Sequence, residues 1–100
     1  MANRERITEL RAKLRRVLPE LASRYNVRSL GIFGSRVRED EHEGSDVDLL
    51  VSFDEIPGLL KFIEFEHHLS DLLGMDVDLV MEDALKEQIR RAILEEIVPV

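Results

Sequence analysis

Apolar positions along this chain of 100 residues repeat with two different periods, and each period predicts a type of element. Spacings of three and four residues predict helices, and these cover about residues 3–24, 57–73 and 83–98. Short apolar runs bounded by polar turns predict strands, and these cover residues 27–33, 47–53 and 76–81. Pro19 lies inside the first helical pattern and predicts a kink or a helix restart near Leu18.

This order of elements predicts a small α/β (α+β) domain in which a three-stranded mixed sheet is flanked by helices. We expect the first two strands to be antiparallel, and the last two to be parallel through a right-handed crossover. The nearly continuous apolar run of residues 47–53 is typical of a central strand covered on both faces. The last helix is expected to close the core. A chain of this length has room for one core, so residues 1–100 are expected to form a single domain.

Two carboxylates begin the second predicted strand. Asp46 and Asp48 are two residues apart, so the strand period places both on one face of the sheet. Two like charges at such a short distance repel each other unless a cation lies between them. Carboxylate oxygens are ligands that suit Mg²⁺ or Mn²⁺, and Mg²⁺ is commonly held by one or two carboxylates together with substrate phosphates. The pattern therefore predicts a metal site at the start of this strand.

A third carboxylate is expected from the last predicted strand. If the last two strands are parallel, Asp78 lies at the same edge of the sheet as Asp46 and Asp48. Asp76 shares the face of Asp78 and is the alternative ligand. Asp78 is favoured because its apolar neighbours predict a deeper position, where an ionised carboxylate needs a partner. Three such carboxylates holding two metal ions would support phosphoryl transfer without a covalent nucleophile.

A turn that follows the first predicted strand supplies candidate phosphate ligands. Gly34 allows close approach of the backbone to a ligand, and Ser35 offers a hydroxyl and a helix N-terminus that attracts anions. Arg36 adds a cation. We therefore expect Gly34, Ser35 and Arg36 to bind the phosphates of a nucleotide.

These two motifs together resemble a known family. Gly34-Ser35 followed after ten residues by Asp46-x-Asp48, each at the end of an apolar run, is similar to the signature of polymerase-β-type nucleotidyltransferases. The short chain and the sequence of residues 44–51 resemble the minimal nucleotidyltransferase (MNT) branch, the antitoxin partners of HEPN-domain proteins. The resemblance implies the nucleotidyltransferase fold, with Asp46, Asp48 and Asp78 as catalytic residues and ligands of two Mg²⁺ ions. It also implies AMP transfer from ATP to a hydroxyl of a HEPN toxin, such as that of a tyrosine.

Composition limits the partners further. The net charge is −7, which disfavours broad binding to a nucleic-acid backbone but allows a nucleotide escorted by metal, or a basic protein. The chain has no cysteine, which excludes disulfides and thiol catalysis. With neither a signal sequence nor a long apolar stretch, we expect a cytoplasmic protein without membrane contact. A homo-oligomer is compatible with the sequence. The sequence indicates neither the acceptor of the transferred group nor the base of the donor nucleotide.

Three other functions compete with the interpretation as a nucleotidyltransferase. An antitoxin that neutralises its partner by binding alone fits the acidic surface and the lack of an acceptor-binding domain. A phosphatase of the haloacid dehalogenase type is disfavoured because there the Asp-x-Asp pair follows its apolar strand, whereas here it precedes residues 49–51. An EF-hand is not supported, because the later loop glycine and the closing glutamate are absent.

Overall fold

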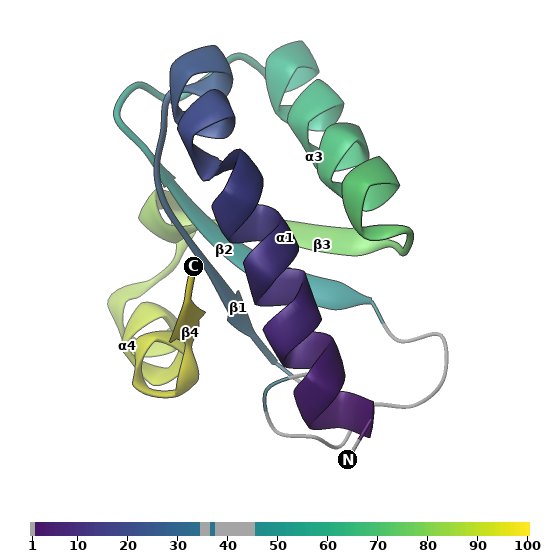
Figure 1. The fold of residues 1–100 in the computed structure, drawn as a ribbon. Coiled ribbons are helices and arrows are strands. Elements are labelled where there is room, and N and C mark those ends of the chain that lie inside the picture. The colour runs from purple at the N-terminus through teal and green to yellow at the C-terminus, as the bar shows by residue number, and fades with distance from the viewer. Residues whose placement is uncertain (1, 35–36, 38–45) are drawn as a thin grey trace.

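The structure is a computed structural model that describes residues 2–34, 37 and 46–100, with side chains from residue 7 onward. Helices α1, α3 and α4 and strands β1 to β4 follow one another with a short 3₁₀ helix, η1, before α4 (Figure 1). The bounds are α1 Ala2–Tyr25, β1 Val27–Phe33, β2 Val47–Phe53, α3 Leu59–Leu73, β3 Val77–Met81, η1 Glu82–Ala84, α4 Glu87–Glu96 and β4 Val98–Pro99.

The strands form one mixed sheet in the order β3-β2-β1-β4. Strands β1 and β2 are antiparallel, and β2 and β3 are parallel, so both predicted pairings are confirmed. β2 lies between β1 and β3, as its apolar run predicted, and all but one of its residues are buried. The α/β class with a mixed sheet is therefore confirmed, while the strand count differs by one.

The C-terminal segment differs from the single helix predicted over residues 83–98. Helix α4 ends at Glu96, and the chain then forms the short strand β4, which pairs antiparallel with β1. The backbone N–H of Val100 donates to the carbonyl of Leu30 at 2.9 Å, and the Arg11 side chain donates to the carbonyl of Pro99 at 2.8 Å. Pairing with β1 thus overrides the helical pattern of the last residues.

Helix α1 runs through Pro19 without a break, so of the predicted kink or restart near Leu18 the restart is wrong and the kink stays a prediction. Helix α3 ends as its sequence predicted, because Gly74 adopts the left-handed conformation with φ 71°. The N–H of Gly74 donates to the carbonyl of Ser70 at 2.8 Å, which satisfies one of the last carbonyls of the helix. None of the described helices is both long and apolar enough to cross a membrane.

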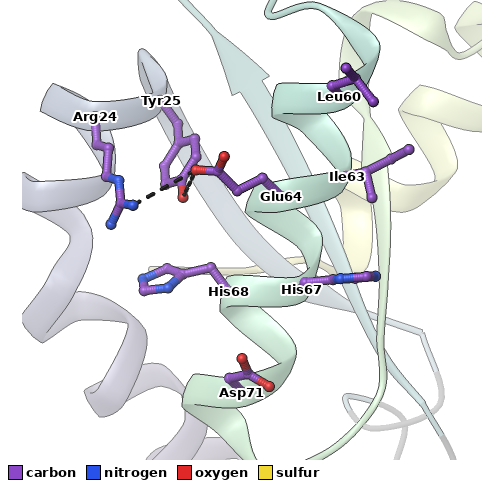
Figure 2. A pocket seen from close by; sticks show the side chains of 8 residues that line it. All are labelled: Arg24, Tyr25, Leu60, Ile63, Glu64, His67, His68 and Asp71. Atoms are coloured by element: carbon purple, nitrogen blue, oxygen red, sulfur yellow. Dashed lines mark hydrogen bonds and ion pairs between the residues drawn. The ribbon is translucent and has the colours of Figure 1, made fainter.

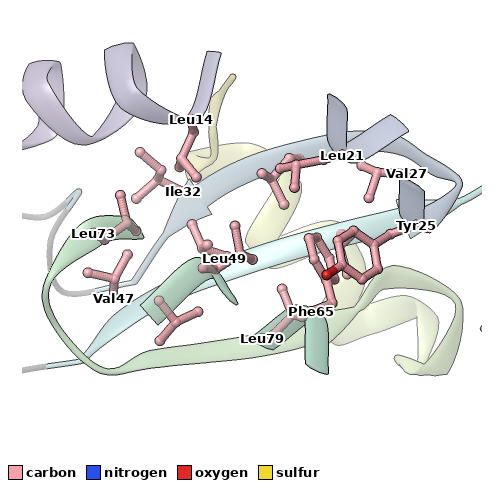
Figure 3. Packing of buried hydrophobic residues seen from close by; sticks show 14 of the residues in the cluster. Leu14, Leu21, Tyr25, Val27, Ile32, Val47, Leu49, Phe65, Leu73 and Leu79 are labelled. Carbon is pink, nitrogen blue, oxygen red and sulfur yellow. The ribbon is translucent and has the colours of Figure 1, made fainter. Parts of the chain in front are cut away.

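Helices α1 and α3 lie together on one face of the sheet and bury the core against it (Figure 1). Leu14 and Leu21 of α1 and Leu49 of β2 are fully buried there (Figure 3). The rings of Tyr25 and Phe65 stack with centroids 4.7 Å apart and join the two helices. Helix α4, whose ten residues are all described, has no fully buried residue, so the expectation that the last helix closes the core is wrong.

Candidate functional site

Asp48 and Asp78 are neighbours across the parallel pair of strands β2 and β3. They are register partners, and adjacent strands lie about 4.8 Å apart. Val47 and Leu49 are buried in the core under α1 and α3, so the alternation of the strand directs Asp48 to the opposite face of the sheet. The two carboxylate side chains therefore project from adjacent positions on the face of the sheet opposite α1 and α3.

The surroundings of the two carboxylates are different. Asp48 is half-buried on a central strand. Asp78 is exposed, so the expectation that its apolar neighbours bury it is wrong, and Asp76 is exposed as well. The physical reason is that β3 lies at the edge of the described sheet, where apolar residues on either side of Asp78 do not bury it.

The register nevertheless separates the two alternatives for the third carboxylate. Asp78 lies within β3 opposite Asp48, whereas Asp76 precedes the strand. The carbonyl of Asp76 accepts a hydrogen bond from the N–H of Val47 at 3.0 Å, so the backbone of Asp76 joins β3 to the start of β2. Asp78 is therefore the residue placed directly beside Asp48.

Asp46 lies just before β2 and is exposed. Within the described part of the chain, no three histidine or carboxylate side chains converge as the ligands of a metal ion do. The structure therefore brings two of the three predicted carboxylates to adjacent positions and leaves Asp46 at the strand entrance. Their donor chemistry fits a hard divalent cation, because all three offer carboxylate oxygens and phosphates of a substrate can complete such a site.

Gly34 lies against Asp48 at the end of β1. Its φ of 84° lies in the left-handed region, and a Cβ there would overlap the Asp48 carboxylate. In the structure the group that approaches the Gly34 backbone is thus the Asp48 side chain. Ser35 and Arg36, the other predicted phosphate ligands, lie outside the described residues.

Both backbone polar groups of Gly34 have protein partners. Its carbonyl accepts a hydrogen bond from the N–H of Val37 at 3.1 Å. Its N–H donates to Oε1 of Glu96, at the end of α4, at 3.2 Å. Glu96 was not among the predicted site residues, and the two residues are 62 positions apart, so no local sequence signal indicated the contact.

A hollow of about 480 Å³ opens between α1 and α3 (Figure 2). The side chains that line it are Arg24, Tyr25, Leu60, Ile63, Glu64, His67, His68 and Asp71. His67 and His68 project in different directions from α3, as expected for adjacent helical positions (Figure 2). Because the hollow lies across the sheet from the paired carboxylates, it is not part of the candidate site.

Tyr25 forms one wall of this hollow. Its hydroxyl donates to Oε2 of Glu64 at 3.0 Å, and Arg24 approaches the same oxygen at 3.7 Å. Burial raises the pKa of the Tyr25 hydroxyl above its usual value, and the hydrogen bond to Glu64 raises it further. The phenol is therefore a structural hydrogen-bond donor.

The mixed sheet, the two helices on one face and the carboxylates on the other define a nucleotidyltransferase. The family model for the nucleotidyltransferase domain matches residues 14–100, and the chain belongs to this family. The protein adenylyltransferase MntA of Thermococcus cleftensis is 56% identical over 79 residues, which are 79% of this chain and 80% of the relative. The expected enzyme class is thus confirmed.

Solved structures agree with this assignment. A structure described as a minimal nucleotidyltransferase superposes with a TM-score of 0.79 at 37% identity and covers 94% of this chain and 95% of its own. A complex of a tri-AMPylated HEPN toxin with an MNT antitoxin from Shewanella oneidensis has a TM-score of 0.65 at 16% identity. That match covers 90% of this chain and 70% of the other, and at this identity it shows the fold alone.

Proposed function

We propose that this chain is a protein adenylyltransferase that transfers AMP from ATP to a hydroxyl of a HEPN toxin and thereby acts as its antitoxin. The observation that carries the proposal is the register pairing of Asp48 with Asp78 on the face of the sheet opposite α1 and α3, next to Gly34. This arrangement places hard oxygen donors beside Gly34, the first of the three residues proposed to bind the phosphates. The name of the MntA relative, with 56% identity, supports adenylyl transfer.

The proposed reaction is an in-line displacement at the α-phosphorus of ATP. The acceptor oxygen forms a bond to phosphorus, the bond to the bridging oxygen of the β-phosphate breaks, and pyrophosphate leaves. Asp46, Asp48 and Asp78 would hold two Mg²⁺ ions, or Mn²⁺ in their place. When bound, such ions neutralise phosphate charge and lower the pKa of the attacking hydroxyl.

The remaining residues of the site would orient the nucleotide. Gly34 places its backbone against the Asp48 carboxylate, so these two residues of the proposed site are in contact. Ser35 and Arg36 are proposed to bind the outer phosphates. Because ATP and Asp48 are both negative, a cation between them is what makes their approach favourable.

A HEPN toxin is the proposed acceptor, and a tyrosine is the proposed hydroxyl. The Shewanella oneidensis complex, in which an AMPylated HEPN toxin is bound to an MNT antitoxin, supports this choice. The net charge of −7 also suits a basic partner better than a nucleic-acid backbone.

The test is transfer of label from α-labelled ATP to a candidate HEPN protein, in the presence of Mg²⁺. We expect Asp78→Asn to abolish labelling, and Asp76→Asn, the matched control two residues away, to keep labelling within about twofold of the wild type. Both side chains are exposed, so neither substitution removes a buried charge. Equal labelling by the two variants would contradict the assignment of Asp78. Labelled GTP, CTP and UTP in parallel reactions identify the donor.

A second candidate function is an antitoxin that acts by contact alone. Apolar side chains at the start of α3 favour it, because Ile56, Leu59 and Leu60 are 55%, 75% and 83% exposed and such patches mark protein contacts. The Asp78→Asn variant separates the two functions. If this variant still relieves growth arrest by the toxin without labelling it, binding alone is sufficient.

A further inference from the structure

The backbone N–H of Gly34 is held by a side chain that is distant in the sequence. Gly34 is buried, and its N–H donates to Glu96, which lies at the last position of α4. The side-chain oxygen of Glu96 accepts this N–H, so the contact fixes the direction of the N–H. A glycine peptide has no side chain to restrain its rotation, and the contact supplies that restraint.

The position of Glu96 is itself set by the strand that follows it. The Ile97 side chain fills the space beside Gly31 of β1, and Val98 pairs with Ile32 of the same strand. The chain therefore leaves α4 anchored along β1, which directs Glu96 to the end of that strand. Glu96 is half-buried, and its neighbour Glu95 is exposed on the same helix.

The contact bears directly on the candidate site, because Gly34 also lies against Asp48. With φ at 84°, the glycine lies so close to the Asp48 carboxylate that a Cβ would overlap it. Glu96 holds the N–H of this residue, and the Asp48 carboxylate packs against its Cα. If the Gly34 peptide rotated, the space available to the Asp48 carboxylate would change with it.

We infer, building on the proposed function, that Glu96 is a positioning residue of the nucleotide site that acts through Gly34. Its carboxylate holds the Gly34 peptide in the conformation that keeps Gly34 and Asp48 correctly placed before ATP binds. Loss of this acceptor raises the KM for ATP, because binding must then also fix the Gly34 peptide. Chemistry after binding is affected less, since Glu96 touches no reacting atom.

The negative charge of Glu96 could have the opposite effect on the KM for ATP. The substitution Glu96→Gln distinguishes the effect of the charge from that of the hydrogen bond. A negative side chain near a triphosphate repels it, so removal of the charge alone would strengthen ATP binding. Glu96→Gln removes the charge but keeps a side-chain oxygen that accepts from the N–H of Gly34. Glu96→Ala removes both the charge and the acceptor.

The experiment compares Glu96→Ala, Glu96→Gln and the control Glu95→Ala in steady-state AMP transfer. We expect Glu96→Ala to raise the KM for ATP about tenfold, near the low end for a hydrogen bond to a charged group, with kcat changed less than about threefold. Glu96→Gln and Glu95→Ala should both stay within about twofold of the wild-type KM. An unchanged KM in Glu96→Ala, or a lower KM in both Glu96 variants, would overturn the inference.

A second readout needs neither metal nor nucleotide. Hydrogen exchange of the Gly34 amide, followed by NMR, should be at least about tenfold faster in Glu96→Ala than in the wild type and nearly unchanged in Glu96→Gln. Equal Gly34 protection in Glu96→Ala and the wild type would also overturn the inference. Absence of AMP transfer by the wild-type chain would instead contradict the proposed function and leave the exchange result to decide the role of Glu96.

Discussion

Gly34→Ala is the substitution whose effect on the candidate site follows most directly from the structure. The residue has φ 84°, where a side chain costs about 1–2 kcal/mol of stability. In addition, the new Cβ would lie 3.0 Å from Cγ and 3.2 Å from Cβ of Asp48, and closer still to one carboxylate oxygen. The Asp48 side chain must therefore turn away, which a surface-facing carboxylate can do without unfolding the domain.

Gly74→Ala is the matched control for this substitution. Gly74 has φ 71°, and no described atom lies within 4 Å of the position its Cβ would take. Both variants should lose about 1–2 kcal/mol in the free energy of unfolding, measured by urea denaturation. AMP transfer should fall about 100-fold in Gly34→Ala, because a displacement of about 1 Å in a reacting group can cost that much, and should stay near wild type in Gly74→Ala. Equal activity in the two variants would refute the proposed coupling between Gly34 and Asp48.

The remaining predictions concern Tyr25, which lies away from the candidate site. Tyr25→Phe removes the hydrogen bond to Glu64 and should lower the free energy of unfolding by about 1 kcal/mol near pH 7, with AMP transfer unchanged. The pKa of the Tyr25 hydroxyl is raised above 10.0 in the folded state, so its contribution is fully present below pH 10 and is lost as the pH rises through the folded value. Denaturation between pH 9 and pH 11 should therefore show the stability of the wild type falling toward that of Tyr25→Phe, and a constant difference would contradict this reasoning.

The first two strands could be predicted with their exact bounds because both are apolar runs between polar turns. β1 and β2 cover residues 27–33 and 47–53, as the sequence indicated. The adjacency of Asp48 and Asp78 could also be predicted, because a strand–helix–strand unit favours a parallel pair and both residues stand near strand starts. The pattern of apolar runs and the right-handed crossover together therefore predicted the Asp48–Asp78 pair of the candidate site.

Features that depend on tertiary contacts could not be predicted in this way. Strand β4 has two residues and no period of its own, and it exists because β1 offers an edge for pairing. The contact of Glu96 with Gly34 joins residues 62 positions apart. The exposure of Asp78 was misjudged because apolar neighbours indicate burial in a central strand but not in an edge strand.

We propose that Asp48 serves catalysis and not the stability of the fold, and the substitution Asp48→Asn distinguishes these two roles. The measurement is AMP incorporation into the HEPN partner with Mg²⁺ and ATP, accompanied by a melting curve of the metal-free protein. We expect no incorporation and a melting temperature equal to or above that of the wild type, because the substitution removes a ligand and also relieves repulsion from Asp78 across the strand pair. An Asp48→Asn protein that labels its partner at the wild-type rate would contradict the catalytic assignment, and one that unfolds would show that the carboxylate stabilises the fold.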